Sequence, residues 1–595
     1  MNRLLVLAPL AMTLSLGLVL TGCGGGSSTT PPPPPPPSIT RFTANSPTIT
    51  TGTSTTLTGV FANGTGVITP GNLSATSGVA VNVSPTATTT YILTVTPASG
   101  TAATAATTVT VASATTSSVT VDLTNSGPAV TNKLLGMNMA IWYDVVSNQS
   151  VVVSALQGAG ITQVRWPGGS DSDLYHWSTN TACANISGDS TYVDSNDTFA
   201  NFVSDIAKPA NLDLALTANY GSNAACNGGG DPSEAAAWAT AALAAGITPS
   251  HMTVGNEEYG SWEEDIPTND TPDPTMYASA VVGASGYYNL IKAASPSTLV
   301  GIDVDADNMP GGWDNTVMAN AKGSYDFVEY HYYPEAPGSE SDTFIVQKAA
   351  QELTTNINTV KSELSEWGTP NTPIYVGEIG GPYSNPGKQS WSITQGLYAG
   401  QVLGEMMNAG VSRLTWWIGF GNCNGSNGND STSLYGWQDF GAYNVFSDGS
   451  DDPTCPGAGP LGTMSPTARA FQLFSQMAVN GQTVLTATVV GDTTDVRAYA
   501  ATNPNGTAVL LFNDNETVAQ PVTVTLSGKS TSSSVTVTTY DKAIYDLSGS
   551  PAGTPADPAG TNTWAAPATT SMGTQALPLT LTLTPWSMNM VIIGN

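Results

Sequence analysis

The segment HMTVGNEEYG, residues 251–260, decides the fold of the central part of the chain. Its apolar start is typical of a buried strand, and its glycines and polar residues indicate a loop directly after that strand. Seven further segments share this pattern: KLLGMNMAIW (133–142), ITQVRWPGG (161–169), LDLALTANYGS (212–222), TLVGIDVDA (298–306), YDFVEYHYYP (325–334), PIYVGEIGG (373–381) and VSRLTWWIGF (411–420).

Segments with helical spacing of apolar residues lie between these strands. The clearest are PSEAAAWATAALAAG (232–246), PTMYASAVVGASGYYNLIKAAS (274–295), TFIVQKAAQELTTNINTVKSELSEWG (343–368) and SWSITQGLYAGQVLGEMMNAG (390–410). Eight strands that alternate with helices predict a (β/α)8 barrel, which we place at residues 132–460.

Alternating strand-like runs flank the barrel on both sides. Residues 38–113 predict a small β-sandwich, and the stretch SPTATTTYILTVT (84–96) resembles bacterial immunoglobulin-like modules. Residues 461–595 predict a second, C-terminal β-sandwich. We expect the short segment 117–131 to add a strand to this second sandwich.

The first residues predict an exported, membrane-anchored chain. Residues 1–22 combine a basic head with an apolar run, which is typical of a signal peptide. The ending LTGC (20–23) resembles the bacterial lipobox, which implies lipidation of Cys23. A Gly/Ser tether with seven prolines follows at 23–37. The residue directly after Cys23 is Gly24 and not an acidic residue, so the resemblance implies the outer membrane of a bacterial envelope.

The charge and the cysteines fit this setting. The 595 residues carry a net charge of -29, which repels nucleic acid and favours neutral partners. Apart from Cys23, four cysteines remain, and an even number in an exported chain suggests disulfides. Three pairings are possible; we favour Cys183–Cys226 and Cys423–Cys455, because each pair lies within one region. No histidine has ligand spacing to them, so we expect no metal site at these cysteines, and we expect no cofactor. The loop DVDADN (303–308) leaves a structural calcium ion open as an alternative.

Two glutamates follow strands of the predicted barrel. Glu257 follows MTVGN and Glu378 follows PIYVG, and counting strands places them on the fourth and the seventh. Catalytic groups of such barrels lie at the carboxyl ends of strands. Two carboxylates that face one cavity are what glycoside hydrolysis requires, one as proton donor and one as nucleophile.

Several motifs carry a resemblance to clan A glycoside hydrolases. VGNEEYGSW (254–262) resembles the acid/base motif at strand four, and YVGEIGG (375–381) resembles the strand-seven nucleophile. VRWPGGSDSDLYHW (164–177), YHYYP (330–334) and LTWW (414–417) resemble glycoside hydrolase family 51, the α-L-arabinofuranosidases. Ser170 and Asp171 follow the two glycines, where these enzymes usually carry Asn, which leaves the identity of the sugar open.

The resemblance implies a role for each matching residue. Glu257 would be the general acid and then base, with a pKa raised toward neutrality, and Glu378 the nucleophile. Asn256 would lie near the 2-hydroxyl of the sugar, and Arg165 would keep Glu378 ionised.

Further residues complete the predicted site. Tyr333 or His331 would orient Glu378, although His331 could equally be a buried barrel histidine. Trp416 or Trp417 would form a platform under the sugar; alternation places only one of them inward, and we assign Trp416 to the site, together with Tyr220 and Trp166. Glu263, Glu264 and Asp265 are expected at a solvated rim.

The sequence therefore predicts a retaining glycoside hydrolase that acts on a carbohydrate polymer or oligomer, with α-L-arabinofuranosidase as the first hypothesis. An endo-β-glycanase, such as a glucanase or xylanase, or a β-xylosidase of the same clan is the alternative. A non-catalytic carbohydrate-binding surface lipoprotein is an alternative of another class. The distance between the Glu257 and Glu378 carboxyl groups would discriminate between these classes.

Overall fold

A computed structural model describes most of the chain. The described residues are 35–50, 54–112, 116–185, 187–421, 423–424, 428–436, 440–449, 458–548 and 564–595. The chain divides into two compact units, Met1–Ala112 and Ser113–Asn595. The expected signal segment, most of the tether with Cys23, and Cys455 lie outside the described residues, as does the side chain of Cys423.

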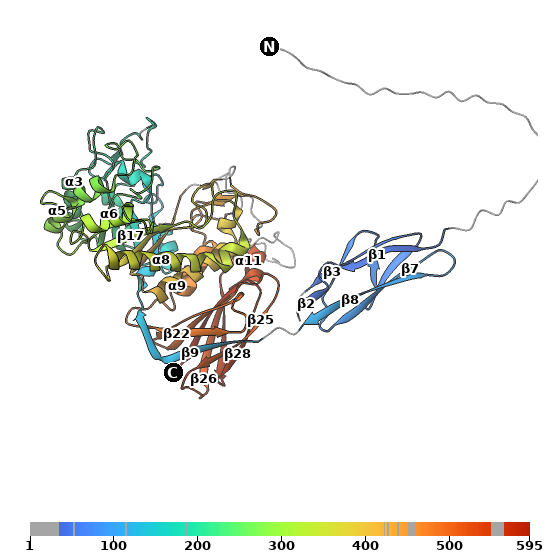
Figure 1. The fold of residues 1–595 in the computed structure, drawn as a ribbon. Helices are drawn as coiled ribbons and strands as arrows, with labels where there is room; N and C mark the ends of the chain where they lie inside the picture. The colour runs from blue at the N-terminus through green and yellow to red at the C-terminus, as the bar shows by residue number, and fades with distance from the viewer. Residues whose placement is uncertain are drawn as a thin grey trace, which may run out of the picture. The chain divides into compact units, whose positions relative to one another are not determined.

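The first unit is a sandwich of two sheets (Figure 1). Its strands are β1 (Ser38–Ala44), β2 (Thr48–Thr50), β3 (Thr55–Ala62), β4 (Thr65–Thr69), β5 (Leu73–Ala75), β6 (Ala80–Val83), β7 (Thr89–Thr96) and β8 (Ala103–Ala112). One sheet has the order β1-β3-β6 and the other β2-β8-β7-β4-β5. Alternate apolar side chains of both sheets, among them Leu57, Leu93 and Val109, meet in one core.

The second unit contains the predicted closed barrel of eight parallel strands. Its strands are β10 (Gly136–Asn138), β11 (Gln163–Trp166), β14 (Asp213–Ala218), β15 (His251–Val254), β16 (Leu299–Val304), β17 (Phe327–Tyr332), β18 (Ile374–Ile379) and β19 (Arg413–Trp416). Each of the eight segments read as a strand contains one of them; Glu257 follows the fourth strand and Glu378 lies in the seventh. The barrel closes where β19 pairs with β10.

Helices connect the strands around the barrel. They are α1 (Gln149–Gly158), α2 (Phe199–Asn201), which continues as a π-helix over Phe202–Ala207, α3 (Pro232–Ala244), α4 (Pro274–Val281), α5 (Tyr287–Ala294), α6 (Trp313–Asn320), α7 (Asp342–Gln347), α8 (Ala349–Glu366) and α9 (Ile393–Ala409). The starts of α3 and α4 follow from sequence: Asp231 and Asp273 each precede a proline and accept a hydrogen bond from the first turn.

The C-terminal part of this unit is a β-sandwich joined by a strand from before the barrel. It follows α10 (Pro466–Phe474) and includes α11 (Lys542–Ser548). Its strands are β9 (Ser117–Ala129), β22 (Thr483–Val490), β23 (Val496–Asn503), β24 (Gly506–Asn513), β25 (Gln520–Leu526), β26 (Ser533–Asp541), β27 (Ala568–Gln575), β28 (Leu579–Leu583) and β29 (Ser587–Gly594).

The order of these nine strands is β27-β26-β29-β24-β23-β22-β9-β25-β28. Strand β9 lies antiparallel to β22 and parallel to β25. Val535 and Val524, which lie near opposite ends of this order, share one buried cluster with Val121 and Ile593. The sheet therefore curves around a core of its own.

Helix α9 joins the barrel to the sandwich (Figure 1). It packs against α8 on one side and contacts β9, β23 and β29 on the other. Gly400 and Gly404 lie one helical turn apart on the sandwich side, and a Cβ at either would meet the ring of Phe512 or Tyr499. These two glycines therefore permit the close approach of helix and sheet.

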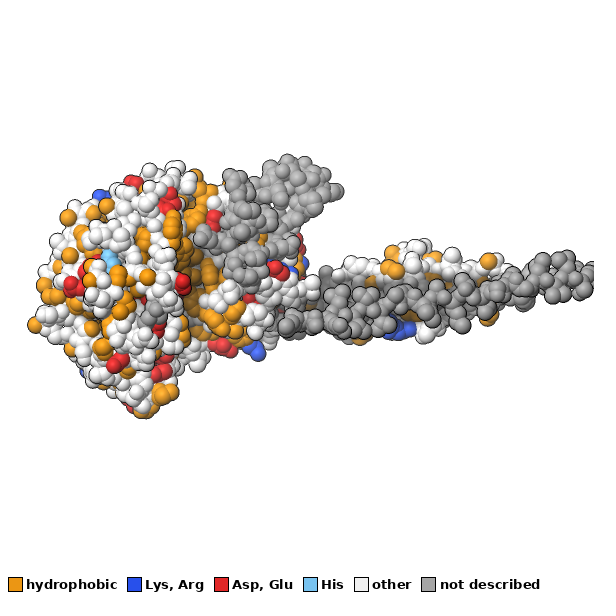
Figure 2. Space-filling model, turned by 90° about the horizontal axis from the view of Figure 1, so that it is seen from above, with side chains coloured by type: hydrophobic (Ala, Val, Ile, Leu, Met, Phe, Trp, Pro, Cys, Tyr) orange, Lys and Arg blue, Asp and Glu red, His pale blue; other side chains and the backbone are white. Residues whose placement is uncertain are grey.

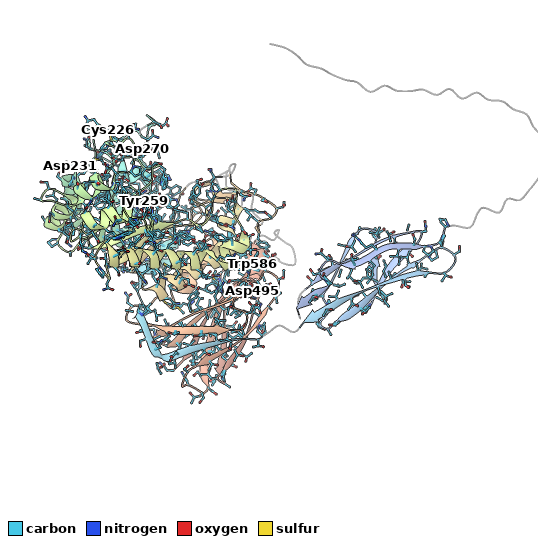
Figure 3. All side chains as sticks on the ribbon, in the orientation of Figure 1. Cys226, Asp231, Tyr259, Asp270, Asp495 and Trp586 are labelled. Atoms are coloured by element: carbon cyan, nitrogen blue, oxygen red, sulfur yellow. A yellow bond between two sulfur atoms is a disulfide. The ribbon has the colours of Figure 1, made fainter. Side chains whose placement is uncertain are left out.

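Polar contacts fix the same junction. Asp495 and Trp586, labelled in Figure 3, belong to the sandwich. Asp495 accepts a hydrogen bond of 2.9 Å from the Gln347 side chain of α7, and the ring of Trp586 lies 5.0 Å from that of Tyr435. The barrel and the sandwich thus form one packed body.

The surface reflects the acidic composition. Figure 2 shows acidic side chains scattered over the viewed face and few basic ones. Within the described ranges, no helix is both long and apolar enough to span a membrane.

Candidate active site

One pocket of about 800 Å³ lies at the carboxyl ends of the barrel strands. It is lined by six aromatic residues, Trp142, Trp262, Tyr333, Tyr383, Trp417 and Tyr443. It is also lined by four acidic residues, Asp171, Glu257, Glu263 and Glu378. Aromatic faces next to carboxyl groups suit a ligand that has apolar C–H faces and many hydroxyl groups.

Glu257 lies in the turn that follows β15. Gly255 and Glu257 both adopt left-handed backbone angles, with φ of 78° and 50°, and this conformation is costly for a glutamate. The turn directs the carboxylate into the pocket. There Oε1 lies 2.8 Å from His331 Nδ1, and Oε2 accepts a hydrogen bond of 2.7 Å from the Trp262 indole.

Glu378 lies near the end of β18, and both of its oxygens are held. Arg165 donates to Oε1 at 2.9 Å, and the Tyr333 hydroxyl donates to Oε2 at 2.8 Å. The residue before Glu378 must be glycine, because a Cβ at Gly377 would lie 2.0 Å from a carboxylate oxygen of Glu329.

Arg165 connects the polar residues beneath the pocket. Its Nε lies 2.7 Å from Glu329 Oε1, and its Nη2 donates to Asn256 Oδ1 at 2.7 Å. His331 Nε2 lies 3.1 Å from the same Glu329 oxygen. Three carboxylates, of which Glu329 and Glu378 are buried and Glu257 is half-buried, thus meet two cationic groups when His331 carries two protons.

The groups around His331 indicate that it carries both protons. Burial lowers the pKa of His331, but the charge of Glu378 and the hydrogen bonds to Glu257 and Glu329 outweigh burial and raise this pKa to about 10. The same neighbours keep the Tyr333 hydroxyl protonated: burial and the charge of Glu378 raise its pKa well above the ordinary value.

The order expected for the pKa values of Glu257 and Glu378 is reversed. Burial raises the pKa of Glu257, but the hydrogen bond and charge of His331 outweigh it, so this pKa is lowered. Burial raises the pKa of Glu378 despite His331 and Arg165. The prediction of a raised pKa for Glu257 was wrong because sequence could not show that His331 bonds to Glu257 rather than to Glu378.

Three residues assigned to the site from sequence lie away from it. Trp416 is buried and its ring lies 5.7 Å from Tyr398, outside the pocket, whereas Trp417 lines the pocket. Trp166 is fully buried among the aromatic rings of Phe199, Phe202 and Trp238. It follows Arg165, so strand alternation turns it away from the barrel interior.

Tyr220 is the third of these residues. It is buried behind the pocket, with its ring 5.1 Å from Tyr277. Its backbone N–H donates to Asp173, which also accepts the N–H of Asn256. Tyr220 and Asp173 therefore shape the loop that carries Asn256 and do not line the pocket.

The acids after Glu257 differ from the expected solvated rim. Glu263 and Asp265 are buried, and Glu263 lines the pocket. The chain after β15 folds back over the strand ends instead of leaving into solvent, and periodicity carries no signal for such a path.

Sequence reasoning also missed Glu329, Tyr383 and Tyr443. For Glu329 a signal existed, because it lies two residues before His331 on the same face of β17. Tyr383 and Tyr443 belong to loops, and for these no comparable signal exists.

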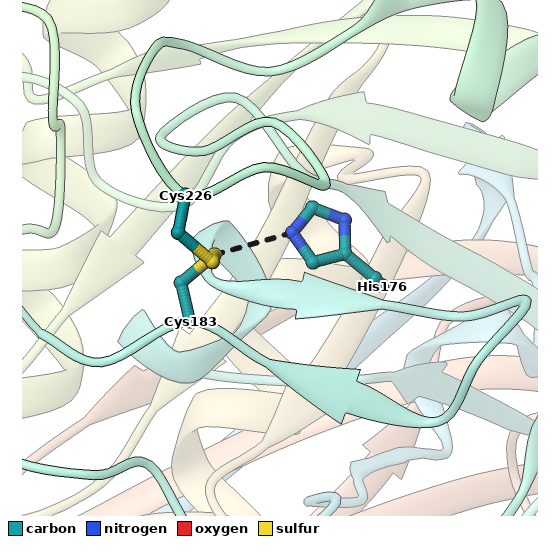
Figure 4. A group of neighbouring side chains, drawn as sticks. All are labelled: His176, Cys183 and Cys226. Atoms are coloured by element: carbon teal, nitrogen blue, oxygen red, sulfur yellow. Dashed lines mark hydrogen bonds between the residues drawn. A yellow bond between two sulfur atoms is a disulfide. The ribbon is translucent and has the colours of Figure 1, made fainter.

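Three groups of side chains resemble metal ligand sets: His176 with Cys183 and Cys226, Glu257 with His331 and Glu378, and Asp305 with Asp307 and Asp314. In the first group the sulfurs form the predicted disulfide, Cys183–Cys226, with His176 Nε2 at 3.4 Å from one sulfur (Figure 4).

The other two groups are explained by hydrogen bonding. Both nitrogens of His331 face carboxylates, which leaves no lone pair for a metal ion. Asp314 and Asp307 accept backbone N–H groups of their own loop. These carboxylates are therefore used to shape the loop after β16.

No family model matches the chain, and no curated protein matches it in sequence. Solved structures do match its fold. The α-L-arabinofuranosidase of Thermotoga maritima, determined with arabinose, has a TM-score of 0.59 at 15% identity, over 80% of this chain and 100% of that one. The family 51 α-L-arabinofuranosidase of Bifidobacterium longum has a TM-score of 0.57 at 15% identity, over 81% and 100%.

A Paenibacillus polymyxa xyloglucanase of glycoside hydrolase family 44 also matches, with a TM-score of 0.55 at 12% identity, over 81% of this chain and 100% of that one. At these identities the likeness shows the fold, a (β/α)8 barrel with a C-terminal β-sandwich.

Proposed function

We propose that the chain is a retaining glycoside hydrolase in which Glu378 is the nucleophile and Glu257 the general acid and base. One observation carries the proposal: an oxygen of Glu257 and an oxygen of Glu378 lie within 4.8 Å of each other in one pocket. Retaining enzymes place the two carboxyl groups roughly 5–5.5 Å apart, whereas inverting enzymes need roughly 6.5–9.5 Å to admit a water molecule.

The first step is attack of Glu378 on the anomeric carbon. Arg165 and Tyr333 donate to its two oxygens, which fixes the orientation of the carboxylate and favours its ionised form. A covalent glycosyl ester forms while the bond to the leaving oxygen breaks.

The leaving oxygen needs a proton in the same step. Before the first step this proton rests on His331, whose Nδ1 lies 2.8 Å from Glu257 Oε1. We infer that His331 passes it to Glu257, which then protonates the leaving group. In the second step a water molecule attacks the ester and returns a proton through Glu257, so that both groups are restored.

The α-L-arabinofuranosides are the first substrates to test. Structural likeness to arabinofuranosidases and the sequence motifs support this choice. The acidic pocket also favours uncharged sugars over uronic acids, because none of the described residues that line it is basic.

An endo-acting β-glycanase is the second candidate, and a specific observation favours it. Trp262 and Tyr383 line the pocket yet are 63% and 61% exposed. Large exposed rings at a pocket mouth can stack on sugar units beyond the one that is cleaved. Likeness to a xyloglucanase agrees with this reading.

Hydrolysis of 4-nitrophenyl α-L-arabinofuranoside beside xylan, arabinan and glucan tests the proposal. We expect cleavage of at least one substrate, with retention of anomeric configuration followed by NMR, and loss of cleavage in Glu257→Ala and Glu378→Ala. Inversion, or full activity in either variant, would contradict it. Binding of these glycans without cleavage would support the non-catalytic alternative.

We also propose that the chain is anchored to the bacterial envelope through lipidated Cys23, on the strength of the LTGC motif. Labelling with a palmitate analogue should mark the wild type and not a Cys23→Ser variant. Equal labelling of both would refute the anchor.

A further inference from the structure

The pocket has an acidic wall that the proposed reaction does not use. Asp171 and Glu263 line it together with Glu257 and Glu378, and none of the basic groups among the described residues lines it. Glu263 comes from the loop after β15, and Asp171 from the loop after β11.

Glu263 is only 2% exposed. Its Oε1 accepts a hydrogen bond of 3.0 Å from the Ser170 hydroxyl. Its Oε2 is buried and accepts no hydrogen bond within 3.5 Å, although the Asn256 side chain lies close enough to affect the carboxyl group. Burial, together with the charges of Glu257 and Asp173, raises the pKa of Glu263 well above the ordinary value, against weaker hydrogen bonding from the Asn256 and Ser170 side chains.

A buried carboxyl oxygen without a partner is costly, so native proteins rarely leave one without a use. Water or a ligand can satisfy it. Glu263 lines the same pocket as Glu257 and Glu378, so a ligand that fills this pocket can reach the wall that Glu263 forms. Carbohydrates offer suitable hydrogen-bond donors on every ring: hydroxyl groups, or an ammonium group in an amino sugar.

We propose that Glu263, held in place by Ser170, determines specificity by binding a hydroxyl or ammonium substituent of the sugar at Oε2. This inference rests on the proposed function. It assigns the sugar-recognising contact to the loop that carries the acid/base, at a carboxyl group that takes no part in the reaction.

A structural role for Glu263 is the competing explanation. The hydrogen bond from Ser170 ties the loop after β11 to the loop after β15, so a variant could act by loosening both loops. Such loosening would reduce cleavage of every substrate alike. Loss of a specific contact would reduce cleavage only of substrates that carry the group Glu263 binds.

The experiment compares the wild type with Glu263→Ala and Glu263→Gln, with Glu366→Gln as a control that removes an exposed carboxylate from the end of α8. The substrates are the 4-nitrophenyl glycoside that the wild type cleaves best, its monodeoxy analogues and its 2-amino-2-deoxy analogue. Thermal melting of each variant reports whether it is folded.

For hydroxyl recognition, we expect Glu263→Ala to lower kcat/KM on the parent glycoside by about 10- to 100-fold. The loss should disappear on one deoxy analogue, and Glu263→Gln should retain part of the activity. For ammonium recognition, the wild type should prefer the amino analogue, and both variants should lose that preference.

Equal losses of Glu263→Ala on all analogues, or no loss on any, would overturn the inference while the proposed function stands. A wild type that cleaves no glycoside would overturn the proposed function first, and the inference with it. The two failures are therefore distinguishable.

Discussion

The two ends of the barrel bury charged groups in opposite ways. At the amino-terminal end, Asp213 pairs with Lys133 at 2.8 Å and with Arg413 at 3.0 Å. Burial raises the pKa of Asp213, but these two cations lower it to about 2. At the carboxyl end, Arg165 and His331 face three carboxylates, and further acids line the pocket.

The comparison separates structural from functional charge. At the amino-terminal end each charge has a partner, and the pairs join strands that are distant in sequence. At the other end negative charge exceeds positive charge, which costs stability but prepares the site for proton transfer. Barrel enzymes in general keep function at the carboxyl ends of the strands, and this chain shows the division in its ion pairs.

The largest expected effect is at Glu378. Glu378→Ala should lower kcat by at least about 10⁴-fold, because a nucleophile has no substitute in the site. Stability should change little, since the variant removes one of several crowded carboxylates. With azide, the variant should form a glycosyl azide of the opposite anomeric configuration to the substrate, which NMR can identify. An azide of the same configuration would argue against Glu378 as nucleophile.

At Arg413 we expect the opposite result, a loss of stability with little change in kcat. Arg413→Leu should lower the free energy of unfolding by about 2–4 kcal/mol, because the largely buried Asp213 keeps only Lys133 and the Ser250 hydroxyl as partners. The kcat should stay within about twofold of wild type. Urea denaturation and steady-state kinetics give both numbers. A large loss of kcat in a stable variant would contradict the assignment of a purely structural role to the charges at the amino-terminal end.

Two histidines should give opposite pH dependences of stability. Burial and Arg413 lower the pKa of His251 to about 3, so the folded chain binds fewer protons than the unfolded chain below pH of about 6.5. Its contribution is therefore lost as pH falls from about 6.5 to 3. His331, with a pKa of about 10, holds a proton that the unfolded chain releases, so its contribution is lost as pH rises from about 6.5 to 10.

Thermal melting from pH 4 to 10 checks this, and each contribution should be about 2–4 kcal/mol. His251→Phe should flatten the acid side of the profile, and His331→Gln the alkaline side. Identical profiles for both variants would count against the assigned shifts.

The smallest effect concerns two adjacent tryptophans. Trp417→Ala should lower kcat/KM by about 3- to 12-fold through loss of ring stacking, with little change in stability. Trp416→Ala, the matched control, should mainly lower stability, because its ring is buried against Tyr398. The opposite pattern would restore Trp416 as the platform.

The sequence was sufficient for the barrel and for bringing Glu257 and Glu378 to one pocket, because strand ends and strand count depend on local patterns. The sequence placed Arg165 in the site. Because adjacent side chains of a strand point to opposite faces, Trp166 should then have been excluded from it. It could not choose between Trp416 and Trp417, because β19 ends at Trp416 and alternation no longer holds beyond it.

The paths of the loops and the positions of the protons could not be predicted from the sequence. Nothing local shows that the loop after β15 buries Glu263. Likewise, the residue type of His331 does not reveal which carboxylate it bonds. Both depend on contacts between segments that are distant in sequence.

Strand β9 has a consequence for how the second unit is synthesised. Asn125 of β9 donates to Thr486 of β22, a residue 361 positions later. The barrel is made between these two strands, so β9 emerges long before its first partner exists. Its edges must stay unpaired meanwhile, which exposes it to mispairing. A chain shortened at either end of the second unit would lack strands of this sheet, so we do not expect the barrel to fold without the sandwich.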